Sequence, residues 1–347
     1  MREAKRLRQF ASDNNSGVCP EVWAALQEAN AGHVTGYGDD PWTERAKQLI
    51  RDLLETDCDA FFVFNGTAAN SLALASMCDS YHSVITFDYS HMETDECNAP
   101  GFFAPGVKLH PVKGENGKIT PGAIEHAANA RRDVHASMPR VVSLTQATEL
   151  GTVYTPDELT AISKTARDLG LLVHMDGARF ANAAASLGVK PRAVSWECGV
   201  DVLSFGGTKN GMAFGDAVVF FNRSLSQDFL YRCKQSGQLA SKMRFIVAQW
   251  IGLLQDGAWL RNAKNANDTA MLLERKLRGL PGVRVLYPRE VNAVFVDMPK
   301  RVLDGLHERG WHFYMDVGPG GARLMCSWDS TVDDVESFVR DVSDLSK

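Results

Sequence analysis

The sequence predicts an α/β protein: a large domain on a mainly parallel sheet, followed by a small C-terminal α+β domain. The first observation is that short apolar runs alternate with helical segments between about residues 59 and 221. Parallel strands need crossover connections and are buried on both faces, so this alternation is typical of a sheet covered by helices on both sides. The second observation is that the order of elements changes after a long helical segment. We therefore place the large domain at 1–264 and the small domain at 265–347.

The predicted sheet begins with the run DAFFVF at 59–64, which is rich in aromatic and β-branched residues. The segment NGTAANSLALASM follows it, and its small residues and leucines suit a helix after a glycine turn. Strand, turn and helix thus form one unit. The further predicted strands are SVITFD (83–88), RVVSLTQ (140–146), LLVHMD (171–176), VDVLSF (200–205) and DAVVFF (216–221).

Helical segments lie between these runs and after them. The amphipathic segment 156–170 begins with a proline and ends with a glycine, as helices prefer. Residues 178–188 predict another helix, and the segment from about 225 to 275 is long and helical. The pattern then changes to short runs and an acidic final helix, which predicts the small domain. These last segments are VRVLYP, AVFVDM, LHERGWHFY, ARLMCSW and TVDDVESFVRDVSDL.

Composition argues against several classes of protein. With 45% hydrophobic and 23% charged residues, the 347-residue chain has the make-up of a globular protein with a large core. Its net charge of -5 lacks the basic surface that nucleic acid or an anionic membrane attracts, so we expect neither partner. No apolar run reaches the length of a transmembrane helix, and none follows the basic start of the chain. We therefore expect a cytoplasmic protein.

The seven cysteines are scattered and form no C-x-x-C motif. Neither a disulfide framework nor a metal site is predicted from them. We expect reduced, mostly buried thiols.

Residues with chemical function follow four of the predicted strands. In open α/β sheets, ligands bind beyond the carboxyl ends of the strands, so these positions are candidates for a site. After the first strand, Gly66, Thr67 and Ala68 open a helix, where a glycine permits close approach and the amides favour a phosphate. An ordinary turn between strand and helix is the alternative. After the second strand comes His91, whose ring is suited to stack on a cofactor; a structural or surface histidine is the alternative.

The other two strand ends carry an aspartate and a lysine. Asp176 follows a mostly apolar run and needs a partner, for which a protonated ring nitrogen and a local salt bridge with Arg179 are the alternatives. Lys209 follows a pair of glycines, and an apolar pocket at a strand end favours its neutral, nucleophilic amine. A solvated loop lysine is the alternative. We expect the glycines to give this lysine room to move.

Together these residues suit pyridoxal 5'-phosphate, bound through a Schiff base. That cofactor needs a phosphate turn, a stacking ring, an acidic partner for its ring nitrogen and an amine. The segment GGTK lacks the spacing of a P-loop, and no serine or threonine follows its lysine. A nucleotide site is therefore not predicted.

Six segments stand in the order found in fold-type-I pyridoxal phosphate enzymes, and together they resemble the low-specificity L-threonine aldolases, a family that includes phenylserine aldolase-like members. The segments are SDNNSG, YGDDPWTERAKQL, FVFNGTAANSLAL, HMETDECNAP, HMDGARFANA and SFGGTKNGM. The resemblance covers essentially the whole chain. It implies an aminotransferase-like large domain, a small C-terminal domain and a homotetramer with active sites at subunit interfaces. It also implies cleavage of L-threonine, L-allo-threonine and other L-β-hydroxy-α-amino acids such as L-phenylserine to glycine and an aldehyde.

The resemblance implies roles for individual residues around the cofactor. Lys209 matches the Schiff-base lysine, Asp176 the partner of the ring nitrogen and His91 the ring-stacking histidine. The positions that match the phosphate-binding turn are Gly66, Thr67 and Ala68, and Arg232 matches a residue that reaches the phosphate.

Further positions match residues that bind the substrate. Ser12, Arg179 and Arg323 match those that hold its carboxylate, and Arg179 also counts among the residues around the cofactor. Tyr37 lies in a loop that approaches the site.

The chain departs from the family at one place. Many members carry Glu-Asn-Thr-His where residues 145–148 read Thr-Gln-Ala-Thr, so the histidine sometimes proposed near the substrate hydroxyl is absent. The base that removes the β-hydroxyl proton in a retro-aldol cleavage is then His91, Asp95 or a bound water. His91 and Asp95 are four residues apart and share a face if their segment is helical.

Two other functions stay open from the sequence. The same cofactor residues serve a β-eliminating lyase or an aminotransferase acting on a small amino acid, which yields pyruvate or another keto acid instead of an aldehyde. A regulatory protein that binds pyridoxal phosphate without turnover is the alternative from another class. The chain has no additional basic helix-turn-helix segment that such a regulator would need.

Overall fold

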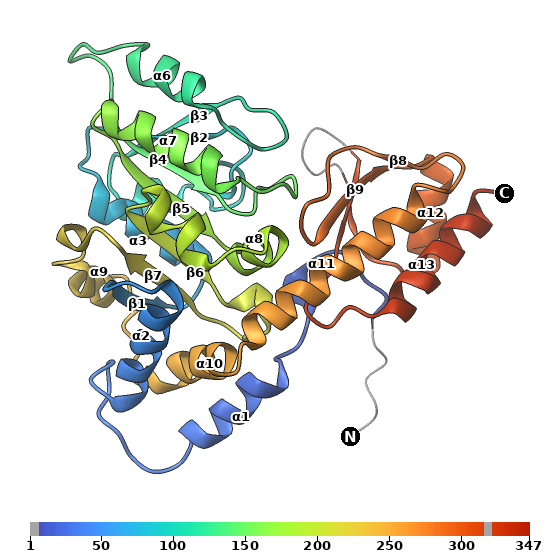
Figure 1. Ribbon diagram of the computed structural model, residues 1–347, viewed down its shortest axis with the longest axis horizontal. Helices are drawn as coiled ribbons and strands as arrows, with labels where there is room; N and C mark the ends of the chain where they lie inside the picture. The colour runs from blue at the N-terminus through green and yellow to red at the C-terminus, as the bar shows by residue number, and fades with distance from the viewer. Residues whose placement is uncertain (1–6, 316–320) are drawn as a thin grey trace.

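The computed structural model describes residues 7–315 and 321–347, which form a large and a small lobe (Figure 1). The basic start of the chain, residues 1–6, lies outside these ranges. A seven-stranded sheet lies in the large lobe, and its strands follow the order β1-β7-β6-β5-β4-β2-β3. The strands are β1 (Asp59–Val63), β2 (His82–Phe87), β3 (Lys108–Val112), β4 (Met138–Thr145), β5 (Leu172–Gly177), β6 (Val202–Gly206) and β7 (Asp216–Phe220).

The prediction of a mainly parallel sheet is confirmed. Neighbours from β6 to β3 pair in parallel, whereas β7 is antiparallel to both β1 and β6. The strand β3 was not predicted, because its sequence KLHPV is short, polar at alternate positions and contains a proline. It lies at the edge of the sheet, where a proline costs no ladder hydrogen bond on the open side.

Helices cover both faces of this sheet, as predicted. On one face, strand side chains such as Leu203 and Phe205 pack in one core with residues of α2 (Pro41–Leu54), α6 (Pro121–Asn129), α7 (Pro156–Asp168), α8 (Phe180–Leu187) and α10 (Arg244–Gln255). On the other, Val202 and Val218 pack in a second core with α3 (Gly66–Met77) and α9 (Phe229–Gln235). Alternate strand residues thus point to opposite faces.

The small lobe is built on a four-stranded sheet of order β10-β11-β9-β8. Its elements are β8 (Arg284–Val285), β9 (Ala293–Asp297), α12 (Lys300–Glu308), β10 (Tyr314–Met315), β11 (Ala322–Met325) and α13 (Val332–Leu345). The helix α11 (Ala258–Leu277) runs between the two lobes (Figure 1) and is continuous across residues 264 and 265. The N-terminal segment joins this lobe, since Phe10 lies in its core and accepts a 2.7 Å hydrogen bond from the Met325 N–H. A division of the chain at 264/265 therefore stays a prediction.

The predicted helical segment 225–275 consists of three helices, α9, α10 and α11. Gly237 and Gly257 separate them and adopt left-handed backbone conformations, with φ of 76° and 67°. The other helices of the large lobe are short or peripheral: α1 (Pro20–Ala29), α4 (His91–Thr94) and α5 (Ala99–Phe103). Among the described residues, no helix combines the length and the apolar character that crossing a membrane requires.

Candidate active site

Two cavities lie at the carboxyl edge of the parallel strands and join one another. The smaller has a volume of about 200 Å³ and the larger about 400 Å³. Four residues line both of them: Asn14, His91, Glu149 and Lys209. A cavity of about 570 Å³ near α6 and the start of β4 is larger, but none of the predicted site residues lines it. Most of the predicted site residues therefore line the two joined cavities, and none lines this third one.

The predicted phosphate turn lies in the smaller cavity. Asn65 caps α3, and its Oδ1 accepts a 2.9 Å hydrogen bond from the Ala68 N–H. Gly66 and Thr67 line the cavity in the first helical turn, where N–H donors have no partner within the helix. A Cβ atom at Gly66 would lie 3.2 Å from Asp216 Oδ2, so a glycine at this position lets the turn lie close to the Asp216 side chain. The Ala68 N–H is bonded to this cap, whereas Gly66 and Thr67 line the cavity, so phosphate binding by Ala68 stays a prediction.

Asp176 lies at the end of β5 and lines the smaller cavity. Its Oδ2 accepts a 2.8 Å hydrogen bond from Asn70 Nδ2, and its Oδ1 accepts one of 3.0 Å from the Ala178 N–H. The alternative of a salt bridge with Arg179 is wrong, because Arg179 donates to Asp13 through Nε and Nη2 at 2.7 and 3.0 Å. The Asp176 carboxylate is therefore held in place by neutral donors and can face a cation in the cavity.

His91 follows β2 and is fixed through one ring nitrogen. Its Nδ1 lies 2.8 Å from Oε1 of Glu96, whose side chain is fully buried. The hydrogen bond to Glu96 raises the pKa of His91, while burial raises the pKa of Glu96. Asn70 Nδ2 also donates to Glu96 Oε1 at 2.9 Å, so one amide links the partner of His91 to Asp176. The ring and the carboxylate are thereby positioned together.

Lys209 lies in a short turn after β6, is half-buried and lines both cavities. Its role as the Schiff-base lysine stays a prediction. The glycines before it serve packing rather than freedom of movement: a Cβ at Gly206 would lie 2.6 Å from the backbone oxygen of Ala178. The turn is held by Asp216 Oδ1, which accepts from the Gly207 N–H at 2.9 Å. Asp216 lies at the start of β7, and burial raises its pKa.

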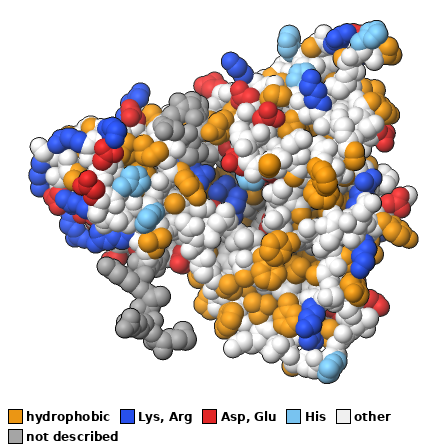
Figure 2. All heavy atoms as spheres, turned by 180° about the vertical axis from the view of Figure 1, so that it is seen from behind, with side chains coloured by type: hydrophobic (Ala, Val, Ile, Leu, Met, Phe, Trp, Pro, Cys, Tyr) orange, Lys and Arg blue, Asp and Glu red, His pale blue; other side chains and the backbone are white. Residues whose placement is uncertain are grey.

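The larger cavity brings together the three residues predicted to hold a carboxylate: Ser12, Arg179 and Arg323. Arg323 comes from the small lobe and Arg179 from the large one, and Figure 2 shows Lys and Arg side chains in the recess between the lobes. Burial lowers the pKa of Arg323, and the positive charge of Arg179 lowers it further. Asp13 is bound to Arg179, and its pKa is low because Arg179 and Lys209 outweigh the effect of burial.

The Arg323 guanidinium is only partly paired within the described residues. Its Nη2 donates to the backbone oxygen of Ala11 at 3.1 Å, and its guanidinium carbon lies 5.1 Å from the ring centroid of Tyr314. Its Nε is buried and has no hydrogen-bond partner among the described residues. Two neighbouring arginines with an unpaired donor fit the carboxylate of a small molecule.

The remaining predicted residues divide into two groups. Asp95 caps the end of α4 and lines the larger cavity together with His91, as expected for a shared face. Tyr37 and Arg232 do not line either cavity; the Tyr37 ring is 52% exposed and lies 4.4 Å from Lys234 Nζ. Their assignments to substrate and phosphate stay predictions.

Sequence reasoning missed several residues of the site. Asp216 was taken only as the first residue of a strand, and Asn14 only as part of the segment SDNNSG. Glu149 directly follows the segment in which a histidine was sought. The missed residues that line the cavities or hold their walls are Asp13, Asn14, Asn65, Asn70, Tyr89, Glu96, Glu149, Ala178, Thr208, Asp216 and Tyr314.

The cavities fit pyridoxal phosphate on observations of this chain alone. The open helix N-terminus suits a phosphate, the held Asp176 carboxylate a cationic ring nitrogen, and Lys209 a carbonyl carbon. The adjoining cavity, with the unpaired Arg323 donor, suits the carboxylate of an amino acid.

Comparison with known proteins agrees with this chemistry. Residues 9–301 match the model of a family described as beta-eliminating lyase. The chain is 59% identical over 335 residues to the low specificity L-threonine aldolase of Pseudomonas aeruginosa, covering 96% of this chain and 97% of that protein. It is 58% identical to the enzyme of the same name from a Pseudomonas species, with the same coverage. The structure of Leishmania major threonine aldolase superposes with a TM-score of 0.92 at 28% identity, covering 98% of this chain and 99% of that one.

Proposed function

The chain belongs to the beta-eliminating lyase family, within which it groups with the low-specificity L-threonine aldolases, and we propose that it cleaves L-threonine and L-allo-threonine to glycine and acetaldehyde. The same reaction extends to other L-β-hydroxy-α-amino acids such as L-phenylserine. The observation that carries this proposal is that a cofactor cavity and a carboxylate-binding cavity meet at Lys209 and His91. An amino acid held in the larger cavity places its α-carbon at that junction.

The cofactor of this family is pyridoxal phosphate, which when bound supplies an electron sink for the pair left on the α-carbon. Gly66 and Thr67 would hold its phosphate through backbone N–H groups, and Lys209 would supply the amine that links it to the chain. Asp176, kept in place by Asn70, would keep a proton on the ring nitrogen. His91 would lie against the ring.

The substrate is oriented by the residues of the larger cavity. Ser12, Arg179 and Arg323 hold its carboxylate, so the bond from the α-carbon to the β-carbon takes a fixed direction. With the carboxylate and the amine fixed, an L-substrate directs its β-carbon toward His91 and Asp95, whereas D-threonine would direct it away, so D-threonine is excluded. The β-carbon meets His91 and Asp95 in a small polar region, which accepts both β-configurations.

Product analysis tests the proposal. Purified protein supplied with pyridoxal phosphate is incubated with L-threonine, L-allo-threonine, L-phenylserine and D-threonine. We expect glycine and the corresponding aldehyde in equal amounts from the three L-substrates and none from D-threonine. Pyruvate or another keto acid without aldehyde would assign the chain to β-elimination or transamination. Efficient cleavage of D-threonine would contradict the carboxylate clamp.

We further propose that the chain is a cytoplasmic homotetramer with active sites at subunit interfaces. Support for contact between copies comes from exposed aromatic side chains: Trp23, Phe64 and Tyr231 are 56%, 52% and 78% exposed. Figure 2 shows hydrophobic side chains gathered on the lower part of the large lobe, the end at which Figure 1 places α1 and α10. Support for a reducing compartment comes from the seven cysteines, all of which are free.

A further inference from the structure

The loop after β4 carries one acidic side chain to the junction of the two cavities. Glu149 lines both the cofactor cavity and the substrate cavity, together with His91 and Lys209. We propose that the Glu149 carboxylate is a catalytic residue that accepts the proton of the substrate β-hydroxyl. This inference rests on the proposed function, because only a β-hydroxy-α-amino acid presents that proton.

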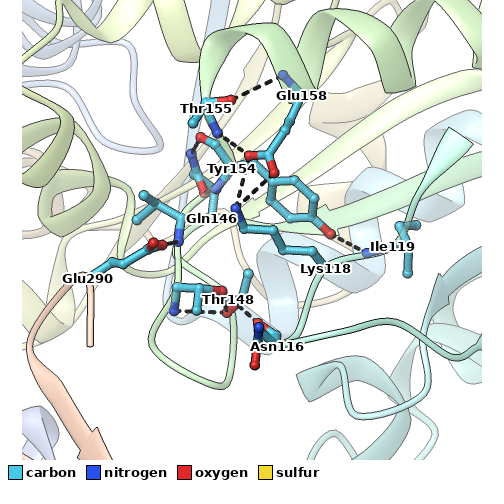
Figure 3. Close-up of polar contacts among 11 residues, drawn as sticks. Asn116, Lys118, Ile119, Gln146, Thr148, Tyr154, Thr155, Glu158 and Glu290 are labelled. Carbon is cyan, nitrogen blue, oxygen red and sulfur yellow. Dashed lines mark hydrogen bonds and ion pairs between the residues drawn. The ribbon is translucent and has the colours of Figure 1, made fainter. Parts of the chain in front are cut away.

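The stem of this loop is fixed by hydrogen bonds within the large lobe (Figure 3). The Gln146 N–H donates to the backbone oxygen of Asp176 at 2.8 Å, so the loop starts beside the predicted ring-nitrogen partner. The Gln146 side chain donates to the Tyr154 backbone oxygen at 2.8 Å and accepts from its N–H at 2.9 Å. The Tyr154 hydroxyl in turn accepts from the Ile119 N–H at 2.8 Å. Both ends of the loop are thus tied together.

The tip of the loop is held from two further sides. Thr148 Oγ1 and Thr152 Oγ1 lie 2.8 Å apart, and Thr152 Oγ1 donates to the Asn116 backbone oxygen at 2.6 Å. Glu290, from the small lobe, accepts from the Val153 N–H at 2.6 Å through Oε2 (Figure 3). A loop anchored to both lobes presents Glu149 at a fixed position, as a catalytic group requires.

The side chain of Glu149 is available to a ligand. It is half-buried, and no hydrogen bond or ion pair joins its carboxylate to another residue within 7–315 and 321–347. It lines both cavities with His91, and its negative charge raises the pKa of His91, after the larger effects of Glu96 and Asp176. It also acts on Arg179 and Arg323, the residues of the carboxylate clamp.

The other side chains near the expected position of the substrate hydroxyl already have hydrogen-bond partners within the chain. His91 is bound through Nδ1 to Glu96, and that bond favours the protonated ring, which is a poor base. Asp95 is exposed to solvent, and its Oδ2 accepts a 2.6 Å hydrogen bond from Thr94 Oγ1. Thr148, at the position of the absent histidine, is buried and bonds to Thr152. Glu149 is therefore the carboxylate best placed for the transfer.

The O–H bond of the β-hydroxyl breaks, and its proton passes to a carboxylate oxygen of Glu149. The O–H electron pair forms the second bond of the aldehyde C=O, and the Cα–Cβ bond breaks with its electron pair staying on the α-carbon. That carbon later takes up a proton to give glycine. The proton on Glu149 returns to solvent when the aldehyde leaves.

The test compares Glu149→Gln with Glu93→Gln in the holoenzyme. Glu93 lies on α4 next to the site but does not line either cavity. We expect Glu149→Gln to lower kcat for L-threonine by about 10²- to 10⁴-fold, the usual contribution of a general base, and Glu93→Gln to leave it unchanged.

Glycine supplies the second readout, because it has no β-hydroxyl. Glu149→Gln should bind pyridoxal phosphate and glycine no more weakly than the wild type, because it removes a negative charge beside the clamp, and it should still exchange the glycine α-proton in deuterium oxide. Unchanged kcat for L-threonine would overturn the inference. A parallel loss of glycine binding, exchange and cleavage would overturn it too, since Glu149 would then only hold the fold. A wild-type protein that exchanges the glycine proton but cleaves no L-threonine would instead contradict the proposed function.

Discussion

The proposed role of Arg323 in binding the substrate carboxylate leads to a first prediction. Its Nε has no partner among the described residues, and its charge lies beside that of Arg179. Arg323→Ala should weaken the binding of glycine by about 10- to 100-fold, the loss expected for a hydrogen bond between charged groups, and leave cofactor affinity unchanged. Absorbance titrations with pyridoxal phosphate and with glycine measure the two separately. Arg301→Ala, an exposed change on α12 of the same lobe, is the matched control. Equal losses for both ligands would remove Arg323 from the clamp.

A substitution of Asp176 tests the part of the site that is proposed to bind the cofactor. Its carboxylate is oriented by Asn70 and Ala178, so it is ready to pair with a protonated ring nitrogen. Asp176→Ala should lose nearly all turnover while the protein still folds, because a ring without that proton is a poor electron sink. Initial rates with L-threonine at saturating cofactor measure the effect. Turnover close to that of the wild type would exclude this role for Asp176.

Single site residues at strand ends could be predicted from the sequence, whereas the residues that hold them in place or complete the site could not. Lys209, Asp176 and His91 follow apolar runs, and the edge of a parallel sheet brings such positions together. Asn70 lies inside a helix and Glu149 in a loop without a recognisable pattern. Their contacts depend on chain segments that meet only after folding.

At the scale of elements, a buried polar chain links three strands below the site. His174 lies two residues before Asp176 on the same side of β5 and is fully buried. Its Nδ1 lies 2.8 Å from Ser143 Oγ on β4, and its Nε2 lies 3.0 Å from Ser204 Oγ on β6. Burial lowers the pKa of His174 from 6.5 to about 4. Between these values the unfolded chain binds a proton at this position and the folded chain does not. The stability that neutral His174 contributes therefore falls as the pH falls through this window.

A His174→Gln variant tests this linkage. The wild type should lose about 2 kcal/mol of stability at this site between about pH 6.5 and about pH 5, and the variant should lack that part of the loss. Urea unfolding midpoints of both proteins at the two pH values give the comparison. An equal acid sensitivity of the two proteins would show that His174 does not titrate on unfolding.

The elements themselves were predicted to different degrees. Runs such as 59–64 and 216–221 are apolar and bounded by turns, so their strands were found with small errors at the ends. The edge strand β3 has too little apolar pattern to be recognised. Helix was predicted through 264/265, but not that this one continuous helix, α11, contributes to the cores of both lobes.

At the scale of the whole molecule, the substrate cavity depends on both lobes and on the N-terminal segment. Ser12 and Asp13 lie between Arg179 of the large lobe and Arg323 of the small one. No local pattern reveals this arrangement, since the two arginines are far apart in sequence. Only the family resemblance indicated that they share a role.

The exposed aromatic surface predicts assembly. Light scattering of the wild type should give the mass of four chains, because burying side chains such as Tyr231 on a partner removes apolar area from water. Tyr231→Glu should yield smaller species, whereas Val332→Glu, on the exposed start of α13 in the small lobe, should not. A wild type that is monomeric and fully active would contradict the proposed assembly.

Lys209 lines both cavities and is the predicted attachment point of the cofactor, so labelling it tests the proposed function most directly. The holoenzyme is treated with borohydride, which fixes the cofactor on the amine that binds it, and the digested protein is mapped by mass spectrometry. We expect one labelled site, at Lys209, and no labelling or cofactor absorbance in Lys209→Ala. A label on another lysine, with cleavage of L-threonine intact in Lys209→Ala, would contradict it.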